Sequence, residues 1–93
     1  MAEFLVELYV PRAETSTVRR WAKDARSATV ELTREGRPVR YVRSIFVPED
    51  ETCFFLYEAA TAEDVEEAAR RASLPVDHAA VAVAGQDGEE ARR

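Results

Sequence analysis

The chain has few of the residues that fibrous, disulfide-rich and disordered proteins need. Its 93 residues include one cysteine, three glycines and four prolines, and 46% are hydrophobic and 33% charged. One cysteine excludes an internal disulfide and agrees with a reducing compartment. The composition therefore indicates a single folded domain. Because a chain of this length buries only about 60 to 65% of its unfolded surface, we expect a second subunit to add stability.

An excess of positive charge is absent, and so are long apolar runs. The 18 acidic residues outnumber the 13 basic ones, which gives a net charge of −5. Nucleic-acid binding needs a clustered positive field, so we expect no nucleic-acid partner. No apolar run approaches the roughly 20 residues that span a bilayer, and the N-terminal "MAEFLVELYVPR" does not have the pattern of a secretory signal. The sequence therefore predicts a cytoplasmic protein with no membrane partner.

Hydrophobic spacing predicts a strand and a helix in the first part of the chain. Residues 4–10, "FLVELYV", are rich in strand-forming residues and are followed by Pro11, as expected of a strand. From Thr15 to about Glu35, apolar residues recur every three or four positions, which is the spacing of one helical face. Gly36 then supplies the usual end of such a helix.

The next part of the chain predicts a hairpin and a second helix. Residues 39–47 and 52–58 alternate as two strands, and "PEDE" between them favours a tight turn. Thr61 and Asp64 have the spacing of a capping box, with aspartate in place of the preferred glutamate or glutamine. Apolar residues then recur at helical spacing as far as Ala72.

A last strand over residues 78–83 completes the order β-α-β-β-α-β. This order predicts an α+β, ferredoxin-like fold, a four-stranded antiparallel sheet with two helices on one face. We assign residues 1–84 to this domain and expect residues 85–93 to form a polar, disordered tail.

The predicted sheet has one face under the helices and one open face that the helices do not cover. Alternation along the strands places Phe4, Val6 and Leu8 under the helices, and we expect Phe54 and Leu56 beside them. The open face should then be an aromatic surface that also carries polar and charged groups. Its predicted members are Glu7, Tyr9, Tyr41, Arg43, Cys53, Phe55, Tyr57 and His78.

A surface of this kind marks an interface or a ligand site. We expect a homodimer packed sheet to sheet, as in a dimeric α+β barrel, because twofold dimers are the commonest oligomers. The two sheets would enclose a cavity for a small-molecule or metal-ion ligand.

The stretches "FLVELYVP" and "VRYVRSIFVPEDETCFFLYEAATAEDVEEAARRASLPVDHAAVAV" resemble a family of small bacterial proteins, some described as nickel-binding or nickel-responsive. The family's Val-Glu pair is matched by Val6 and Glu7, and its Arg-Ser pair by Arg43 and Ser44. This chain departs from the pattern in having Phe55 where a second cysteine often stands and Ser73 where the family has glycine. The resemblance implies a ferredoxin-like dimer, and the members described as nickel-binding make nickel the candidate cofactor.

Glu7, Cys53 and His78 are the candidate metal ligands, because a transition metal needs three or four donors and one chain offers only these on the predicted open face. His78 is the only imidazole, so it is a candidate nickel ligand or general base, with an interface histidine as the alternative. Cys53 is a candidate thiolate ligand or nucleophile, or else a buried small hydrophobic residue.

Glu7 and Arg43 are the other informative pair. A carboxylate in the middle of a central strand must be paired or desolvated, and a guanidinium can meet it with two hydrogen bonds. We therefore expect a Glu7–Arg43 pair that ties the dimer together, with a catalytic acid as the alternative role for Glu7. The three tyrosines of the open face could either bind a ligand through their hydroxyls or pack at an interface.

Three functional classes agree with these residues. The first is a non-enzymatic dimeric binding protein for nickel or another small ligand. The second is a cofactor-independent enzyme of the dimeric α+β-barrel type, an oxygenase, isomerase or cyclase with His78 or Glu7 as base, and it rests on fold analogy. The third is a structural or regulatory interaction module.

Overall fold

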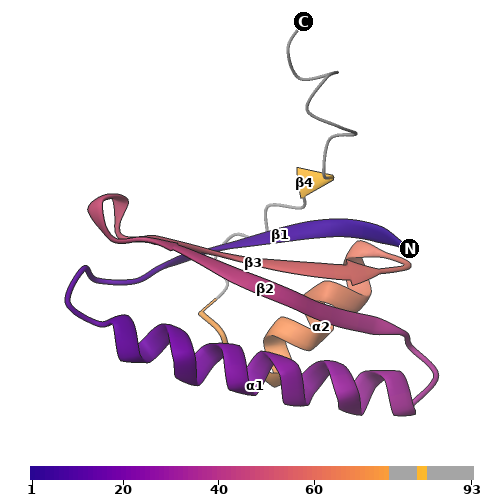
Figure 1. Cartoon of the computed structure of the whole chain (residues 1–93). Coiled ribbons are helices and arrows are strands. Elements are labelled where there is room, and N and C mark those ends of the chain that lie inside the picture. The colour runs from indigo at the N-terminus through magenta and orange to yellow at the C-terminus, as the bar shows by residue number, and fades with distance from the viewer. Residues whose placement is uncertain (76–81, 84–93) are drawn as a thin grey trace, which may run out of the picture.

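The structure is a computed structural model of the chain, and it describes residues 1–75 and 82–83. The helices and long strands lie where the hydrophobic spacing predicts them (Figure 1). In chain order the elements are β1 (Ala2–Tyr9), α1 (Thr15–Arg34), β2 (Val39–Val47), the short 3-10 helix η1 (Pro48–Asp50), β3 (Thr52–Ala59), α2 (Ala62–Arg71) and β4 (Ala82–Val83).

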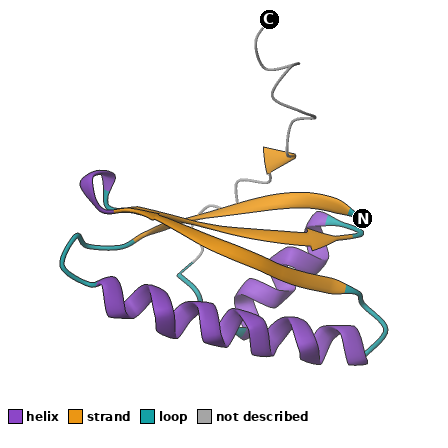
Figure 2. Cartoon of the chain, viewed as in Figure 1, coloured by secondary structure: helices purple, strands orange, loops and turns teal. Residues whose placement is uncertain are grey.

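The three long strands form an antiparallel sheet in which β3 lies between β2 and β1. Both helices lie on one side of this sheet (Figure 2). The two residues of β4 pair with Phe4 and Leu5 of β1, at the edge away from β2. The rest of the strand predicted over 78–83, including His78, lies outside the described residues, as does the tail predicted over 85–93. The class is α+β, and the arrangement is compatible with a ferredoxin-like fold.

Each helix packs one apolar face against the sheet. The buried residues of α1 are Val18, Ala25, Ala28, Thr29 and Leu32. The helix α2 begins as its capping residues predict, because the Thr61 hydroxyl accepts a hydrogen bond from the backbone N–H of Asp64 at 3.2 Å. Just after α2, Ser73 adopts a positive φ of 56°, a conformation that glycine takes more easily.

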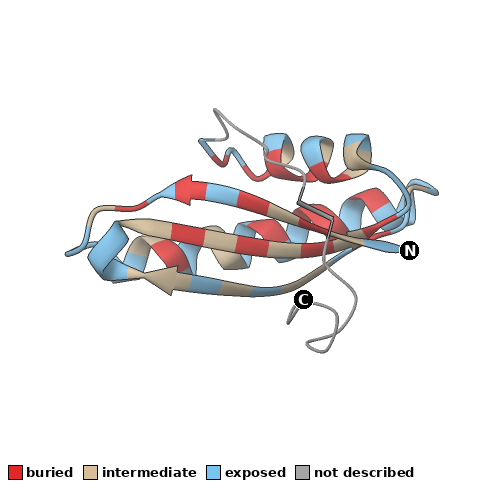
Figure 3. Ribbon diagram, turned by 90° about the horizontal axis from the view of Figure 1, so that it is seen from above, coloured by how far each residue is buried: buried red, intermediate tan, exposed pale blue. Residues whose placement is uncertain are grey.

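The strand β1 has the two faces that its alternation predicts. Phe4, Val6 and Leu8 are buried under the helices, whereas Glu7 and Tyr9 are exposed on the other face. Figure 3 shows the same alternation of buried and more exposed residues along the central strand of the sheet.

The faces predicted for β3 are wrong. Cys53, Phe55 and Tyr57 are fully buried under the helices, and Phe54 and Leu56 lie on the open face. The cause is the register of the sheet, which pairs Leu8 with Cys53, Val6 with Phe55 and Phe4 with Tyr57. Paired residues share a face, so the strongly apolar face of β1 determines which side of β3 is buried.

The face predicted for Tyr41 is also wrong, because β2 contains a bulge. The pairing with β3 shifts between Tyr41 and Arg43, so Val42 is an extra residue. Tyr41 therefore lies on the helix side and packs edge-on against Phe55 and Tyr57, with ring centroids 5.5 and 6.0 Å away. Beyond the bulge, Arg43 is on the open face, as predicted.

Candidate functional site: the open face of the sheet

The open face is the side of β1, β2 and β3 that neither helix covers. The register arranges its residues in rows across the three strands. One row contains Leu5, Leu56 and Arg43, and the next contains Glu7, Phe54 and Ile45. In both rows the central residue, on β3, is apolar. The charged residues are Glu7 on β1, in one row, and Arg43 on β2, in the other.

The apolar residues of the open face are only partly buried. Leu5, Phe54 and Leu56 are intermediate in exposure, and the side chain of Ile45 is 47% exposed. Tyr9, at the end of β1, is 65% exposed. A group of neighbouring apolar residues that is left accessible in this way is typical of an interface or a ligand site.

Glu7 and Arg43 share the open face but belong to strands that flank β3. Their positions in the register are Glu7 opposite Phe54 and Arg43 opposite Leu56, so a whole strand and one diagonal step separate them. Within the described part of the chain no ion pair joins the two residues. A single chain therefore does not form the Glu7–Arg43 pair, and only a contact between two chains could do so.

Cys53 is not on the open face. Its side chain is fully buried under the helices, and burial raises the pKa of the thiol to about 11, against a smaller lowering by the backbone of Ile45. A thiol with this pKa is protonated at neutral pH, and metal ions bind the thiolate. Cys53 therefore has the properties of the buried small hydrophobic residue that was the alternative to a ligand or nucleophile.

The buried aromatic residues of β3 are also separated from the open face. The hydroxyl of Tyr57 is buried and has no hydrogen-bond partner among residues 1–75 and 82–83. Burial, together with the neighbouring Tyr41, raises the pKa of the Tyr57 phenol. Tyr57 and Phe55 contribute to the core of the chain and do not reach the open face.

The described residues of one chain do not supply a nickel site. Nowhere in residues 1–75 and 82–83 do three histidine, cysteine, aspartate or glutamate side chains gather as a metal site requires. Of the three predicted ligands, Glu7 is exposed on the open face, Cys53 is buried on the opposite face, and His78 lies outside the described residues.

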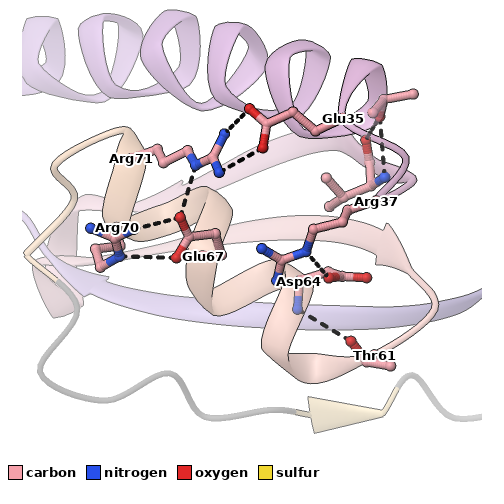
Figure 4. Close-up of polar contacts among 9 residues, drawn as sticks. Glu35, Arg37, Thr61, Asp64, Glu67, Arg70 and Arg71 are labelled. Atoms are coloured by element: carbon pink, nitrogen blue, oxygen red, sulfur yellow. Dashed lines mark hydrogen bonds and ion pairs between the residues drawn. The ribbon is translucent and has the colours of Figure 1, made fainter.

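Sequence reasoning missed the cluster of charges that joins the two helices. Arg71 of α2 forms ion pairs with Glu35, the residue that follows α1, at 2.6 Å and with Glu67 of its own helix at 2.8 Å (Figure 4). It also pairs with Glu31 of α1 at 2.8 Å. The spacing of Glu67 and Arg71 indicates their contact, but nothing in the sequence indicates the contacts with α1. Every group in this cluster has a partner of opposite charge, so the cluster ties the helices together.

These observations describe a small α+β protein in which two helices cover one face of an antiparallel sheet and leave the other face open. The family model described as nickel responsive protein SCO4226-like matches residues 4–80, so the chain belongs to this family. The resemblance to nickel-responsive proteins seen in the sequence is thereby confirmed. No curated protein and no solved structure matches the chain significantly. Among the described residues, none of the helices has the length and apolar character needed to cross a membrane.

Proposed function

We propose that this protein is a small, non-enzymatic binding protein of the bacterial cytoplasm that takes part in a nickel response as a homodimer. In this proposal the chain completes a ferredoxin-like sheet, and two sheets pack face to face to enclose a ligand cavity. The observation that carries the proposal is the open face itself, where Leu5, Phe54 and Leu56 remain accessible beside Ile45. Membership of a nickel-responsive family supports nickel as the ligand.

A second copy of the chain suits the charges of the open face. A twofold interface brings each surface residue of one copy to a matching position on the other, so every contact occurs twice. Glu7 lies on one side of the apolar centre and Arg43 on the other. A twofold axis that passes near Phe54 would allow Glu7 of each copy to pair with Arg43 of its partner, while the apolar centres pack together.

The dimer is tested by exchanging one exposed apolar residue for a charged one. Ile45→Asp places a carboxylate on the open face, so we expect light scattering to report a monomer that remains folded. Val30→Asp is the matched control, since Val30 is 46% exposed and lies on α1, away from the open face. A dimer that survives Ile45→Asp unchanged would contradict the proposed interface.

The nickel part of the proposal rests on Glu7 and His78 from both copies, since oxygen and imidazole ligands both bind nickel. Calorimetric titration of the apo-protein with nickel chloride should give heat with the wild type, and Glu7→Gln and His78→Ala should reduce the affinity. Cys53→Ala should not change the affinity, because the thiol is buried on the other face. Equal nickel affinity in all four proteins would exclude Glu7 and His78 as ligands.

A further inference from the structure

A groove lies between α1 and the first residues of β2, on the helix side of the sheet. It has a volume of about 540 Å³, which is within the usual size range of small-molecule sites. Val39 and Tyr41 line the groove from the helix side of the sheet, because they pair with the buried Ala59 and Tyr57. Arg40, which lies between them on the edge strand β2, pairs with Glu58. The inference drawn from it does not depend on the proposed function.

The walls of the groove are apolar and fixed. Val39 and Tyr41 line it from β2, and Val30 lines it from α1. The hydroxyl of Thr33 donates to the Val39 carbonyl at 3.1 Å and accepts from the Val39 N–H at 3.3 Å, so the helix is tied to the strand beside the groove. Val30 is a large apolar side chain left 46% exposed on α1, and a ligand in the groove would cover it.

The charges around the groove are all positive, although the chain as a whole carries a net charge of −5. Arg26, Arg34 and Arg40 line it, and no aspartate or glutamate is among its lining residues. The guanidinium of Arg26 lies 5.5 Å from the centre of the Tyr41 ring, so a cation–π contact joins two residues that line the groove. Arg40 is bonded to Glu58 at 2.8 Å, whereas Arg26 and Arg34 form no ion pair with a carboxylate of the described residues.

We propose that this groove binds an aliphatic monocarboxylate of medium chain length. The arginines supply charge-assisted hydrogen bonds to the carboxylate, and Val30, Val39 and Tyr41 contact the alkyl chain. Arg26 and Arg34 are eight residues apart on α1, which places their Cα atoms about 12 Å from each other along the helix. An alkyl chain would cover the apolar walls of the groove, whereas a compact anion such as phosphate would leave them exposed.

The ligand class is tested with four probes at concentrations below micelle formation. Chemical-shift mapping of the ¹⁵N-labelled wild type with sodium decanoate should move the amides of residues 26–34 and 39–41. Octanoate should bind more weakly, by roughly twofold for each CH₂ removed from a half-buried chain. Decan-1-ol and inorganic phosphate should each bind at least about tenfold more weakly than decanoate. Equal binding of decanol and decanoate, or shifts confined to the open face, would overturn the proposal.

The arginines are tested with matched variants of one helix. Arg26→Gln and Arg34→Gln should each weaken decanoate binding about fivefold to tenfold, since each removes one charge-assisted contact. Arg19→Gln is the control, because Arg19 is also exposed on α1 but does not line the groove. All three residues are at the surface, so circular dichroism should report the wild-type fold in each variant. The proposal is wrong if Arg19→Gln lowers the affinity as much as the other two changes.

Discussion

Glu7 and Cys53 lie on adjacent strands only one register position apart, yet their side chains point to opposite faces of the sheet. Cys53 pairs with Leu8 under the helices, whereas Glu7 pairs with Phe54 on the open face. A metal ion bound by Glu7 on the open face therefore cannot also be bound by Cys53 of the same chain. The sheet itself separates the two candidate ligands.

We predict that Cys53 reacts slowly with thiol reagents while the protein is folded. Burial raises the pKa of the thiol from 9.0 to about 11, so the thiolate fraction at neutral pH falls about a hundredfold. Ellman's reagent should label native protein far more slowly than protein unfolded in guanidinium chloride. Complete labelling of the native protein at the rate of the unfolded chain would show that Cys53 is accessible.

The same pKa shift predicts a loss of stability at alkaline pH. The folded pKa is raised, so the stabilisation from the neutral thiol is fully present below pH 9 and is lost as pH rises from 9 to about 11. The variant Cys53→Ala should lack this part of the alkaline decline. Urea titrations of the wild type and Cys53→Ala at several pH values between 8 and 11 would show whether the free energy of unfolding falls less steeply with pH in the variant.

We predict that Ser73→Gly stabilises the protein by about 0.5 to 1 kcal/mol, because Ser73 has a positive φ of 56° that disfavours residues with a Cβ atom. Gly36→Ser is the reciprocal control. Gly36 has a φ of 89°, and an added Cβ would meet no atom within 4 Å, so this change tests the backbone alone and should destabilise by about 1 kcal/mol. Urea denaturation measures both. If Ser73→Gly lowers the free energy of unfolding, the serine side chain stabilises the folded protein by more than the strain of its positive φ destabilises it.

We predict that Glu7 and Arg43 are coupled in dimer affinity but not in the stability of the single chain. A double-mutant cycle of Glu7→Gln and Arg43→Met should give a coupling of about 1 kcal/mol for each pair in the dissociation constant of the dimer. The same cycle, run on an Ile45→Asp monomer, should be additive, because a strand separates the two residues within one chain. Additivity in both measurements would show that Glu7 and Arg43 do not meet.

We predict that Glu67 contributes to acid sensitivity. Hydrogen bonds from Arg70 and Arg71 lower the pKa of its carboxyl to about 2, from 4.5. The folded pKa is below the unfolded one, so the stabilisation is present above pH 4.5 and is lost as pH falls toward 2. Glu67→Gln should have a lower Tm than the wild type at pH 7, and the difference should shrink by pH 2. Glu66→Gln, an exposed change on the same helix, should leave the whole pH profile close to that of the wild type.

The sequence was informative wherever the two faces of an element differ in polarity. "FLVELYV" alternates apolar and polar residues, so the faces of β1 could be predicted correctly. "CFFLYEA" is apolar at five successive positions, and only its pairing with β1 determines which alternate set is buried. No residue in "VRYVRS" indicates the bulge at Val42. A strict alternation along the strand places Tyr41 and Arg43 on the same face, whereas the bulge places them on opposite faces. The groove beside α1 combines residues from two elements, and periodicity within one element does not reveal it.

The bulge at Val42 also affects how readily another strand could add to the edge of the sheet. The strand β2 is at one edge of the sheet, where unpaired backbone groups could recruit a strand from another molecule. An extra residue interrupts the regular ladder and increases the local twist, so a straight incoming strand cannot pair along the whole edge. Association of copies at this edge is therefore disfavoured, whereas the proposed packing through the open face would close after two molecules.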